Sequence, residues 1–297
     1  MRRIVDCILL TALVCWRRIT VVQAYITIGE AMYTIGFIGS GNMAEALIKG
    51  VLAGGLYGTD EICASDISGE RLDYIAGEYK ICTENSNSSL AAHSRIVILS
   101  VKPHYIADVL DEIKGSITND TIVISIAAGI TIEKIAGALD KGQVIRVMPN
   151  TPALVGNGMS GIYSNNATAD SMQMAVKLFS AVGKTVVVES EELIDALTAV
   201  SGSGPAYFFL LIEEMIKAAE KLGLSGEAAK ELVLQTARGA AILADGSEYG
   251  PAELRKKVSS PGGTTEAAIK AFVDGGFGEL VTKAMTAARD RSVELSR

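Results

Sequence analysis

The chain has 297 residues, of which 49% are hydrophobic and 21% charged, and its formal net charge at pH 7 is −7. This composition is typical of a globular protein with one or two cores and not of an intrinsically disordered chain. Only 5% of the residues are aromatic, and the basic clusters are short (Arg17-Arg18 and Arg255-Lys256-Lys257), so we expect no nucleic-acid partner.

Cysteine and histidine usage excludes two further classes of site. The four cysteines have no C-x-x-C spacing, and there are only two histidines. We therefore expect no disulfide framework and no metal site. A reducing, cytoplasmic compartment fits best.

The first 32 residues differ from the rest. An arginine-rich start precedes an apolar stretch from Ile4 to Val14, which Asp6 interrupts. That stretch is too short to span a bilayer, and the best match to a signal-peptide cleavage site, Val22-Gln23-Ala24, is poor. We interpret residues 1–32 as an extension, either a non-native start upstream of Met32 or a disordered segment. Weak membrane anchoring is the alternative.

From Tyr33 to Leu193, short apolar runs alternate with amphipathic segments. Buried strands are predicted at YTIGFI, EICAS, RIVILSV, TIVISI and QVIRVM, with GMSGIYS and KTVVVE at the sheet edge. Amphipathic helices are predicted between them, for example at Met43–Leu52, Gly69–Gly77, Ile106–Ile113 and Ile132–Leu139. This alternation predicts an α/β fold with a Rossmann-type, mainly parallel sheet, a dinucleotide-binding domain over residues 33–193.

The first predicted strand runs into Gly39-Ser40-Gly41-Asn42-Met43-Ala44, a G-x-G-x-x-A motif before a helix. Gly39 permits a tight turn, Gly41 lets the backbone approach a pyrophosphate, and Ala44 lets the helix lie close to the sheet. Phosphate oxygens then meet the amides of the helix N-terminus. Because the motif lies in a strand–turn–helix context, it predicts dinucleotide binding rather than a merely structural turn.

Two further residues follow predicted strands at the ligand-binding edge. Asp66 follows the second strand, where an acidic residue commonly holds the ribose 2′-hydroxyl of NAD and repels the 2′-phosphate of NADP. Its alternative role is to cap the next helix, together with Ser68. Lys102 closes the run LSVKP and could contact the cofactor, or it is a solvated lysine.

After Leu193 the strand signals stop, and residues 194–297 are predicted to be all helical. One helix begins around Pro205 and ends at Gly223, and Ser225 can cap the next. The helices predicted after Gly223 cover Glu227–Ala244, Pro251–Lys257, Glu266–Val273 and Gly278–Leu295. The apolar run Ala206–Ile212 is followed by two glutamates, which favours a domain or subunit interface and no stable membrane insertion.

The stretch SSPGGTT interrupts these helices from Ser259 to Thr265. Pro261 breaks the preceding helix, the two glycines permit tight geometry, and Thr264 or Thr265 can cap the next helix. Backbone amides at a helix start can bind an anion. The alternative is an ordinary connector between helices.

From Tyr33 onward the chain resembles the pyrroline-5-carboxylate reductase family. The resemblance is carried by GFIGSGNMA, SVKPH, SIAAGI, VIRVMPNTP, SGSGPAY, VSSPGGTT and GGF, in this order and at family-like spacing. It implies reduction of a cyclic imine, 1-pyrroline-5-carboxylate, to L-proline by NADPH, the last step of proline biosynthesis. It also implies a helical dimerisation domain at residues 194–297 and a homodimer, often within a larger ring, usually a decamer.

The resemblance also assigns site residues. The nucleotide site comprises Ile38, Gly39, Ser40, Gly41, Asn42, Met43, Asn85, Ser100, Val101, Lys102 and Pro103, and the substrate site comprises Val258, Ser259, Ser260, Gly263, Thr264 and Thr265. Asp66 departs from the small polar residue common at its position, so NAD is an alternative to NADP.

For catalysis, the amides around Ser260, Gly263 and Thr264 would hold the substrate carboxylate, and Thr265 would orient the ring nitrogen. The imine would be protonated from solvent or through Thr265. Ala127–Gly129 and Met148–Pro152 would line the nicotinamide side, or form ordinary turns.

Two other functions fit parts of the pattern. A 3-hydroxyacid dehydrogenase-like enzyme would need a lysine, and an asparagine one turn later, in the segment SGSGPAYFFLLIEEMIKA, where neither stands at the expected place. A non-catalytic dinucleotide sensor would need no substrate loop, and SSPGGTT argues against it.

Overall fold

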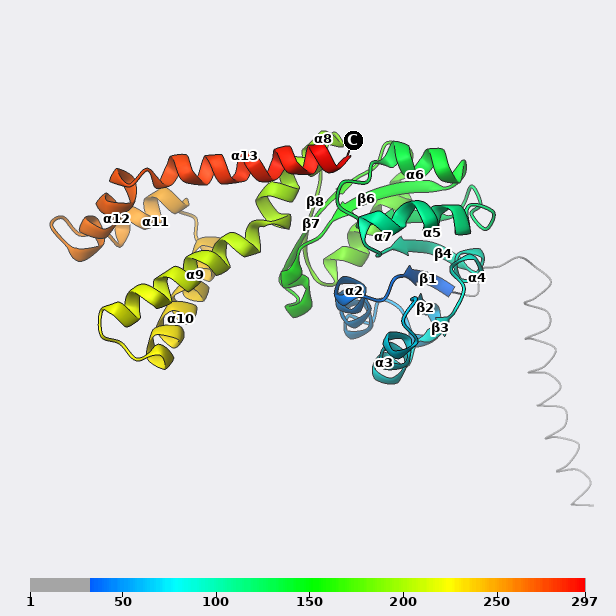
Figure 1. Ribbon diagram of the computed structural model, residues 1–297, viewed down its shortest axis with the longest axis horizontal. Coiled ribbons are helices and arrows are strands. Elements are labelled where there is room, and N and C mark those ends of the chain that lie inside the picture. The colour runs from blue at the N-terminus through cyan, green and yellow to red at the C-terminus, as the bar shows by residue number, and fades with distance from the viewer. Residues whose placement is uncertain (1–32, 297) are drawn as a thin grey trace, which may run out of the picture. The chain divides into compact units, whose positions relative to one another are not determined.

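The structure is a computed structural model that describes residues 33–296 (Figure 1). The predicted extension at residues 1–32 lies outside them. Contacts divide the chain into two compact units. Among the described residues, the first holds 33–127 with Ile132–Arg146 and Ser164–Val182, and the second holds Ala128–Thr131, Val147–Tyr163 and 183–296.

The first unit is built on parallel strands. They are β1 (Tyr33–Ile38), β2 (Ile62–Ser65), β3 (Cys82–Glu84), β4 (Ser94–Leu99), β5 (Ile122–Ser125) and β6 (Gln143–Met148), whose last two residues are grouped with the second unit. With β7 (Gly158–Tyr163) and β8 (Gly183–Val187), the sheet order is β3-β2-β1-β4-β5-β6-β7-β8, and β1 pairs with both β2 and β4. The mainly parallel sheet expected from the alternation is therefore confirmed.

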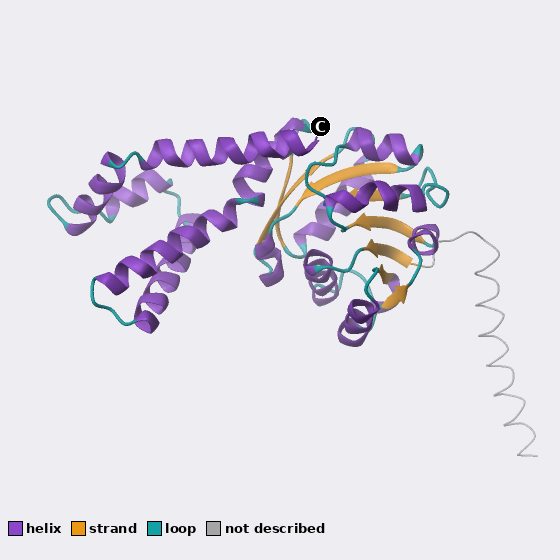
Figure 2. Cartoon of the chain, viewed as in Figure 1, coloured by secondary structure: helices purple, strands orange, loops and turns teal. Residues whose placement is uncertain are grey.

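Six helices of the first unit join or flank these strands (Figure 2). They are α2 (Asn42–Ala53), α3 (Gly69–Tyr79), α4 (Asn87–Ala92), α5 (Ile106–Ile113), α6 (Ile132–Leu139) and α7 (Ala169–Ser180). Ile35, Phe37 and Ile98 are fully buried in β1 and β4. Each such side chain contributes about 1.5–3 kcal/mol of hydrophobic stabilisation, and burial on both faces explains the continuous apolar runs of the sequence.

The second unit contains two strands and a helical region. The strands are β7 (Gly158–Tyr163) and β8 (Gly183–Val187), which pair in parallel. The helices are α8 (Glu192–Leu197), α9 (Gly204–Lys221), α10 (Gly226–Gly246), α11 (Pro251–Lys257), α12 (Thr264–Asp274) and α13 (Phe277–Ser296), with a π-helical turn at Thr198–Gly202. Because contacts group β7 and β8 with these helices, the domain boundary at Leu193 stays a prediction.

Details of the helical region confirm two expectations from sequence. Pro205 lies in the first turn of α9, where its missing amide hydrogen costs nothing. Ser225 caps α10 by accepting a hydrogen bond from the Ala228 amide at 3.3 Å. Buried Asp195 of α8 accepts a 2.6 Å hydrogen bond from the Ser292 hydroxyl, which ties α8 to α13.

One stretch in the described part of the chain, Glu192–Lys221, is long and apolar enough to cross a membrane by length and composition. Its most apolar window has a mean hydropathy of 1.2 and is 22% buried. The π-helical turn and Pro205 interrupt it. By length and composition alone, a buried core helix meets the same two criteria.

Candidate active site

The loop that follows β1, residues 39–41, is called the glycine loop here, and its two glycines have different surroundings. Gly39 has φ +89°, and a Cβ there would lie 2.8 Å from the Val101 side chain and 2.9 Å from the Ser100 carbonyl oxygen. Gly41 is exposed, and no atom lies within 4 Å of its Cβ position. Gly39 is therefore required by packing inside the protein, whereas the open space at Gly41 allows a ligand to approach the backbone.

Helix α2 starts at this open space without a side-chain cap. Gly41 is its N-cap residue, and no side chain accepts a hydrogen bond from the first turn. The first amides of a helix have no partner within the helix, so those that begin at Asn42 and Met43 are available to an anion. The predicted motif thus forms a cradle that fits the pyrophosphate of a dinucleotide.

The loop after β4 supports the glycine loop from the side. The Ser100 amide donates to the Ile38 carbonyl at 2.9 Å, and its hydroxyl donates to the same oxygen at 3.0 Å and to the Gly39 carbonyl. Val101 packs against Gly39. Lys102 and Pro103 are exposed at the start of a short 3-10 turn, at the carboxyl edge of the sheet. Ile38, Ser100 and Val101 therefore belong to one rigid corner.

Asp66 lies against the glycine loop. Its Oδ2 accepts hydrogen bonds from the Ser40 amide at 2.7 Å and the Ser40 hydroxyl at 3.0 Å, and its Oδ1 accepts one from the Ser68 amide at 3.0 Å. Ser68 is the N-cap of α3 and accepts from the Arg71 amide. Asp66 therefore joins the glycine loop to the turn that opens α3. Ile67 beside it is 92% exposed.

Asn85, another predicted nucleotide residue, has no contact to this loop among the interactions described for residues 33–296. It is exposed after β3, while neighbouring Asn87 accepts a 2.7 Å hydrogen bond from the Ser65 hydroxyl at the end of β2. The Asn87 side chain also donates to Glu112 at 2.7 Å. Asn87 is a contact that sequence reasoning missed.

A second missed group surrounds Glu45, one turn into α2. Its Oε2 pairs with Arg71, and its Oε1 accepts hydrogen bonds from the hydroxyls of Tyr79 at 2.8 Å and Tyr74 at 3.0 Å. Burial disfavours the charged form of Glu45, but the hydrogen bonds from Arg71 and the two tyrosines outweigh it and lower the pKa of the carboxyl. Glu45 is therefore a carboxylate at neutral pH.

The predicted substrate loop lies in the second unit. Val258 ends α11, the Ser259 hydroxyl donates to the Arg255 carbonyl at 2.7 Å, and the Gly263 amide donates to the Ser260 carbonyl at 2.9 Å. Gly262 has φ +67°, so glycine is favoured there. These contacts form the tight turn that the sequence predicts.

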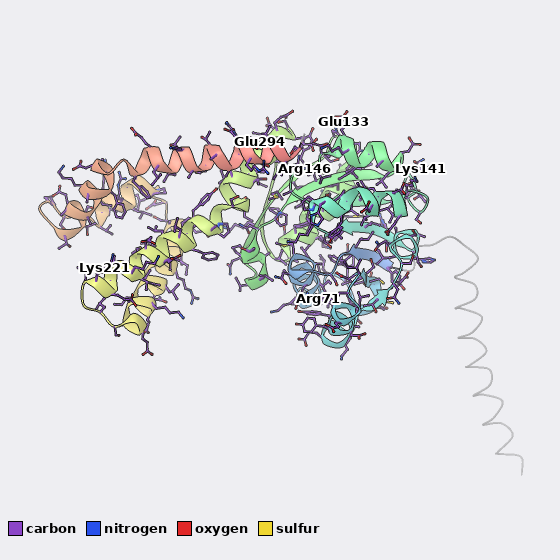
Figure 3. All side chains as sticks on the ribbon, in the orientation of Figure 1. Arg71, Glu133, Lys141, Arg146, Lys221 and Glu294 are labelled. Carbon is purple, nitrogen blue, oxygen red and sulfur yellow. The ribbon has the colours of Figure 1, made fainter. Side chains whose placement is uncertain are left out.

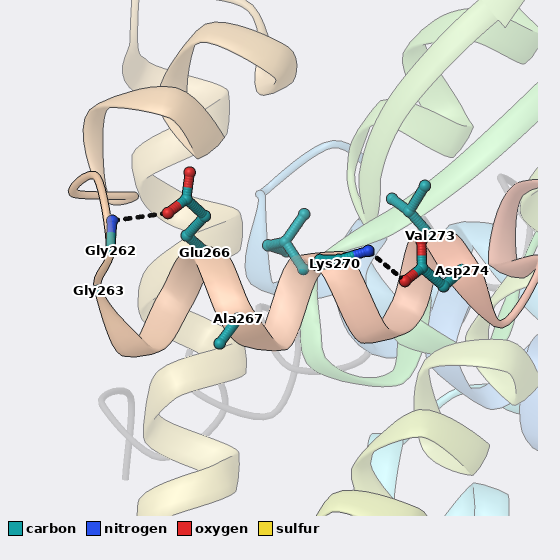
Figure 4. A pocket seen from close by; sticks show the side chains of 8 residues that line it. Gly262, Gly263, Glu266, Ala267, Lys270, Val273 and Asp274 are labelled. Atoms are coloured by element: carbon teal, nitrogen blue, oxygen red, sulfur yellow. Dashed lines mark hydrogen bonds and ion pairs between the residues drawn. The ribbon is translucent and has the colours of Figure 1, made fainter.

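Helix α12 begins earlier than predicted, and the predicted cap is wrong. Thr264 and Thr265 are its first two residues, and Gly263 is the N-cap with no side-chain cap. The Glu266 side chain instead reaches back to accept a 2.6 Å hydrogen bond from the Gly262 amide (Figure 4). The helix therefore starts without a threonine cap, which leaves the amides of its first turn open.

The exposure of this turn suits ligand binding. Thr264 is exposed, Thr265 is half-buried, and neither hydroxyl has a partner within the described part of the chain. A hollow beside them is lined by Gly262, Gly263, Glu266, Ala267, Ile269, Lys270, Val273 and Asp274. The Gly263 amide is engaged in the turn, so the amides of Thr264 and Thr265 are the stronger candidates for holding an anion.

The other motifs play structural roles that their sequence left open. Asn150 of MPNTP donates to the Ser201 carbonyl at 3.0 Å and accepts from the Met159 amide at 2.8 Å. Gly129 has φ +74°, and a Cβ there would lie 2.8 Å from the Leu295 Cβ. The predicted nucleotide residues thus belong to the first unit and the predicted substrate residues to the second. Residues 33–296 contain no group of three or more His, Cys, Asp or Glu side chains placed for a metal ion.

Comparison with known proteins adds two family matches. Residues 34–129 match the family described as NADP oxidoreductase, coenzyme F420-dependent, and residues 191–295 match pyrroline-5-carboxylate reductase dimerisation. Together these matches span both the glycine loop and the substrate loop.

Individual relatives match over nearly their whole length. The chain is 48% identical to a pyrroline-5-carboxylate reductase of Pseudomonas aeruginosa over 264 residues, covering 88% of this chain and 96% of the relative. A solved pyrroline-5-carboxylate reductase from Coxiella burnetii has a TM-score of 0.85 and 41% identity, covering 90% of this chain and 99% of that one. A Plasmodium falciparum pyrroline carboxylate reductase with NADP bound has a TM-score of 0.81 and 31% identity, covering 91% and 100%.

Proposed function

The chain belongs to the pyrroline-5-carboxylate reductase family, and we propose that it reduces 1-pyrroline-5-carboxylate to L-proline by hydride transfer from NAD(P)H. The structural observation that carries this proposal is the uncapped start of α12 beside a glycine turn. It offers backbone amides and two threonine hydroxyls that have no partner among residues 33–296 to a small anionic substrate. A non-catalytic dinucleotide sensor would have no use for such a site.

The nucleotide is held by the glycine loop and its supports. The amides at Gly41–Met43 receive the pyrophosphate, and Ser100 and Val101 hold the loop in shape. Asp66 and Asn85 lie toward the adenosine ribose, and Lys102 and Pro103 line the carboxyl edge. The nicotinamide supplies the hydride, and the protein positions the reacting atoms and excludes water.

The substrate is held through its carboxylate and its ring nitrogen. The amides of Thr264 and Thr265 bind the carboxylate, with the turn at Val258, Ser260 and Gly263 fixing their direction. The Thr265 hydroxyl hydrogen-bonds the ring nitrogen, which orients the C=N carbon. The proton that the imine nitrogen needs comes from solvent or through the Thr265 hydroxyl.

The assembly is a homodimer at least, formed through residues after Leu193, and a ring of such dimers, a decamer, is the larger form expected. The match of residues 191–295 to a dimerisation family supports the dimer. Large apolar side chains are also exposed along α9, namely Phe208, Phe209, Leu210, Leu211 and Met215. An interface between subunits in the cytoplasm accounts for this surface without membrane insertion.

Turnover is the direct test of the proposal. The purified protein is mixed with 1-pyrroline-5-carboxylate and either NADPH or NADH, and both proline formation and loss of absorbance at the nicotinamide band are followed. A 3-hydroxy acid with NAD(P)+ is the control substrate for the dehydrogenase alternative. Proline formation supports the proposal. Dinucleotide binding without turnover of either substrate would favour a sensor.

A further inference from the structure

Arg71 is held in one position by three contacts in the first unit. From α3 it extends toward α2, and it is labelled in Figure 3. Its Nε donates to the Ser40 carbonyl at 2.6 Å, its Nη2 pairs with Glu45, and its guanidinium lies 5.0 Å from the centre of the Tyr74 ring. The side chains of Arg71 and Glu45 are only 25% and 19% exposed. Partial burial strengthens such a pair relative to a fully solvated one.

Ser40 connects this pair to Asp66 through its backbone amide and carbonyl groups. Asp66 accepts from the Ser40 amide, and Arg71 donates to the Ser40 carbonyl. Both charged groups therefore lie beside the same residue of the glycine loop. Asp66 receives its three hydrogen bonds from uncharged donors, and in residues 33–296 no basic side chain pairs with it.

The charges around Ser40 do not cancel. Glu45 and Arg71 neutralise each other, which leaves the negative charge of Asp66 uncompensated. If Glu45 were uncharged, the guanidinium would instead balance Asp66. The 2′-phosphate of NADPH carries close to two negative charges that NADH lacks. A change in the net charge around Ser40 should therefore alter the binding of NADPH more than that of NADH.

We propose that Glu45 is a positioning residue for cofactor selectivity, because it holds Arg71 against the Ser40 carbonyl and neutralises its charge. The Glu45–Arg71 pair makes the site beside Ser40, where the adenosine ribose would bind, less favourable for a 2′-phosphate. It therefore reduces the preference for NADPH over NADH. This inference rests on the proposed function, since it assumes that the glycine loop binds a dinucleotide. Tyr74 and Tyr79 support the arrangement by donating to Glu45.

The test is direct binding of the two cofactors without substrate. Dissociation constants for NADPH and NADH are measured from nicotinamide fluorescence for the wild-type chain and for Glu45→Gln. The substitution should tighten NADPH relative to NADH by about fivefold, the size expected when one unpaired cation, the freed Arg71 guanidinium, acts on a doubly charged phosphate in a solvated site. Added salt should reduce this gain by screening.

Glu61→Gln is the matched control. Like Glu45, Glu61 is a carboxylate that accepts hydrogen bonds, in its case from the Thr34 hydroxyl and the Gly58 amide, each at 2.9 Å. It lies just before β2, at the opposite end of that strand from Asp66. The ratio of the two dissociation constants should stay at the wild-type value. Glu45→Ala should shift the ratio of the two dissociation constants in the same direction as Glu45→Gln. Agreement between the two variants would show that the shift is not caused by a folding defect that only the glutamine side chain introduces.

A second background isolates the part played by Arg71. In Arg71→Gln the freed cation is missing, so adding Glu45→Gln should change the ratio by less than it does in the wild type. An unchanged ratio in both Glu45 variants, or a shift toward NADH, would overturn the inference while leaving the reductase function intact. A wild-type chain that binds neither dinucleotide would instead overturn the proposed function, and this inference with it.

Discussion

Replacement of Thr265 by alanine tests the proposed catalytic contact with little interference from stability. The Thr265 hydroxyl has no partner among the described residues and is the second residue of α12, so its loss breaks no hydrogen bond in the free protein. Alanine is also the better helix former, by roughly half a kcal/mol. The free energy of unfolding should therefore be unchanged or slightly raised, and the whole penalty should appear in the complex.

The size of that penalty follows from an unsatisfied polar group. Loss of a buried hydrogen-bond partner costs about 1–3 kcal/mol, so kcat/KM for 1-pyrroline-5-carboxylate should fall about tenfold or more. The dissociation constant for NADPH should barely change. Thr265→Ser should restore most of the activity, because it keeps the hydroxyl. Thr264→Ala keeps the amide proposed to bind the carboxylate and should have a smaller effect. An unaltered kcat/KM in Thr265→Ala would refute the role assigned to its hydroxyl.

Three further predictions test the cofactor end, the assembly and the N-terminal segment. Asp66→Ser should shift the kcat/KM ratio toward NADPH, because a carboxylate facing the 2′-phosphate repels it by roughly 1 kcal/mol or more; an unchanged ratio would show that Asp66 does not face the ribose. Sedimentation should find at least a dimer, and an active monomer at assay concentrations would contradict the proposed interface. A chain that begins at Met32 should fold and keep full reductase activity, and loss of soluble protein would refute the interpretation of residues 1–32.

Elements with a local signal could be predicted from the sequence. The strands β1, β4, β5 and β6 are short, mostly buried runs rich in apolar residues, and periodicity alone locates α5 and α6. The strand β3 was not predicted, because its three residues are half-buried and form no apolar run. Helix α7 was not predicted either, although two sequence features indicate it. Thr168 caps the helix by accepting a hydrogen bond from the Ser171 amide at 3.2 Å, and Ala175, Leu178 and Phe179 form its buried face.

The start of α12 was misplaced because two opposing preferences act there. Threonine is favoured as a cap, which predicts a helix that begins after Thr265. In the structure the Gly263 amide closes the turn on Ser260, and the Glu266 side chain takes the Gly262 amide, so the backbone is already helical at Thr264. The sequence therefore predicts the position of the turn, but which residue caps the helix depends on contacts within it.

The charged group around Ser40, formed by Asp66, Arg71 and Glu45, could not be predicted from any local sequence pattern. Glu45 and Arg71 are separated by 26 residues and meet only because α2 and α3 follow neighbouring strands of the sheet. A sequence motif can indicate that Asp66 lies near the ribose, since that residue follows a strand in a known arrangement. It cannot indicate that a glutamate one turn into α2 neutralises the cation on α3. Cofactor selectivity in this chain should therefore depend on the balance of three charges around Ser40, and a substitution at Asp66 alone should not account for all of it.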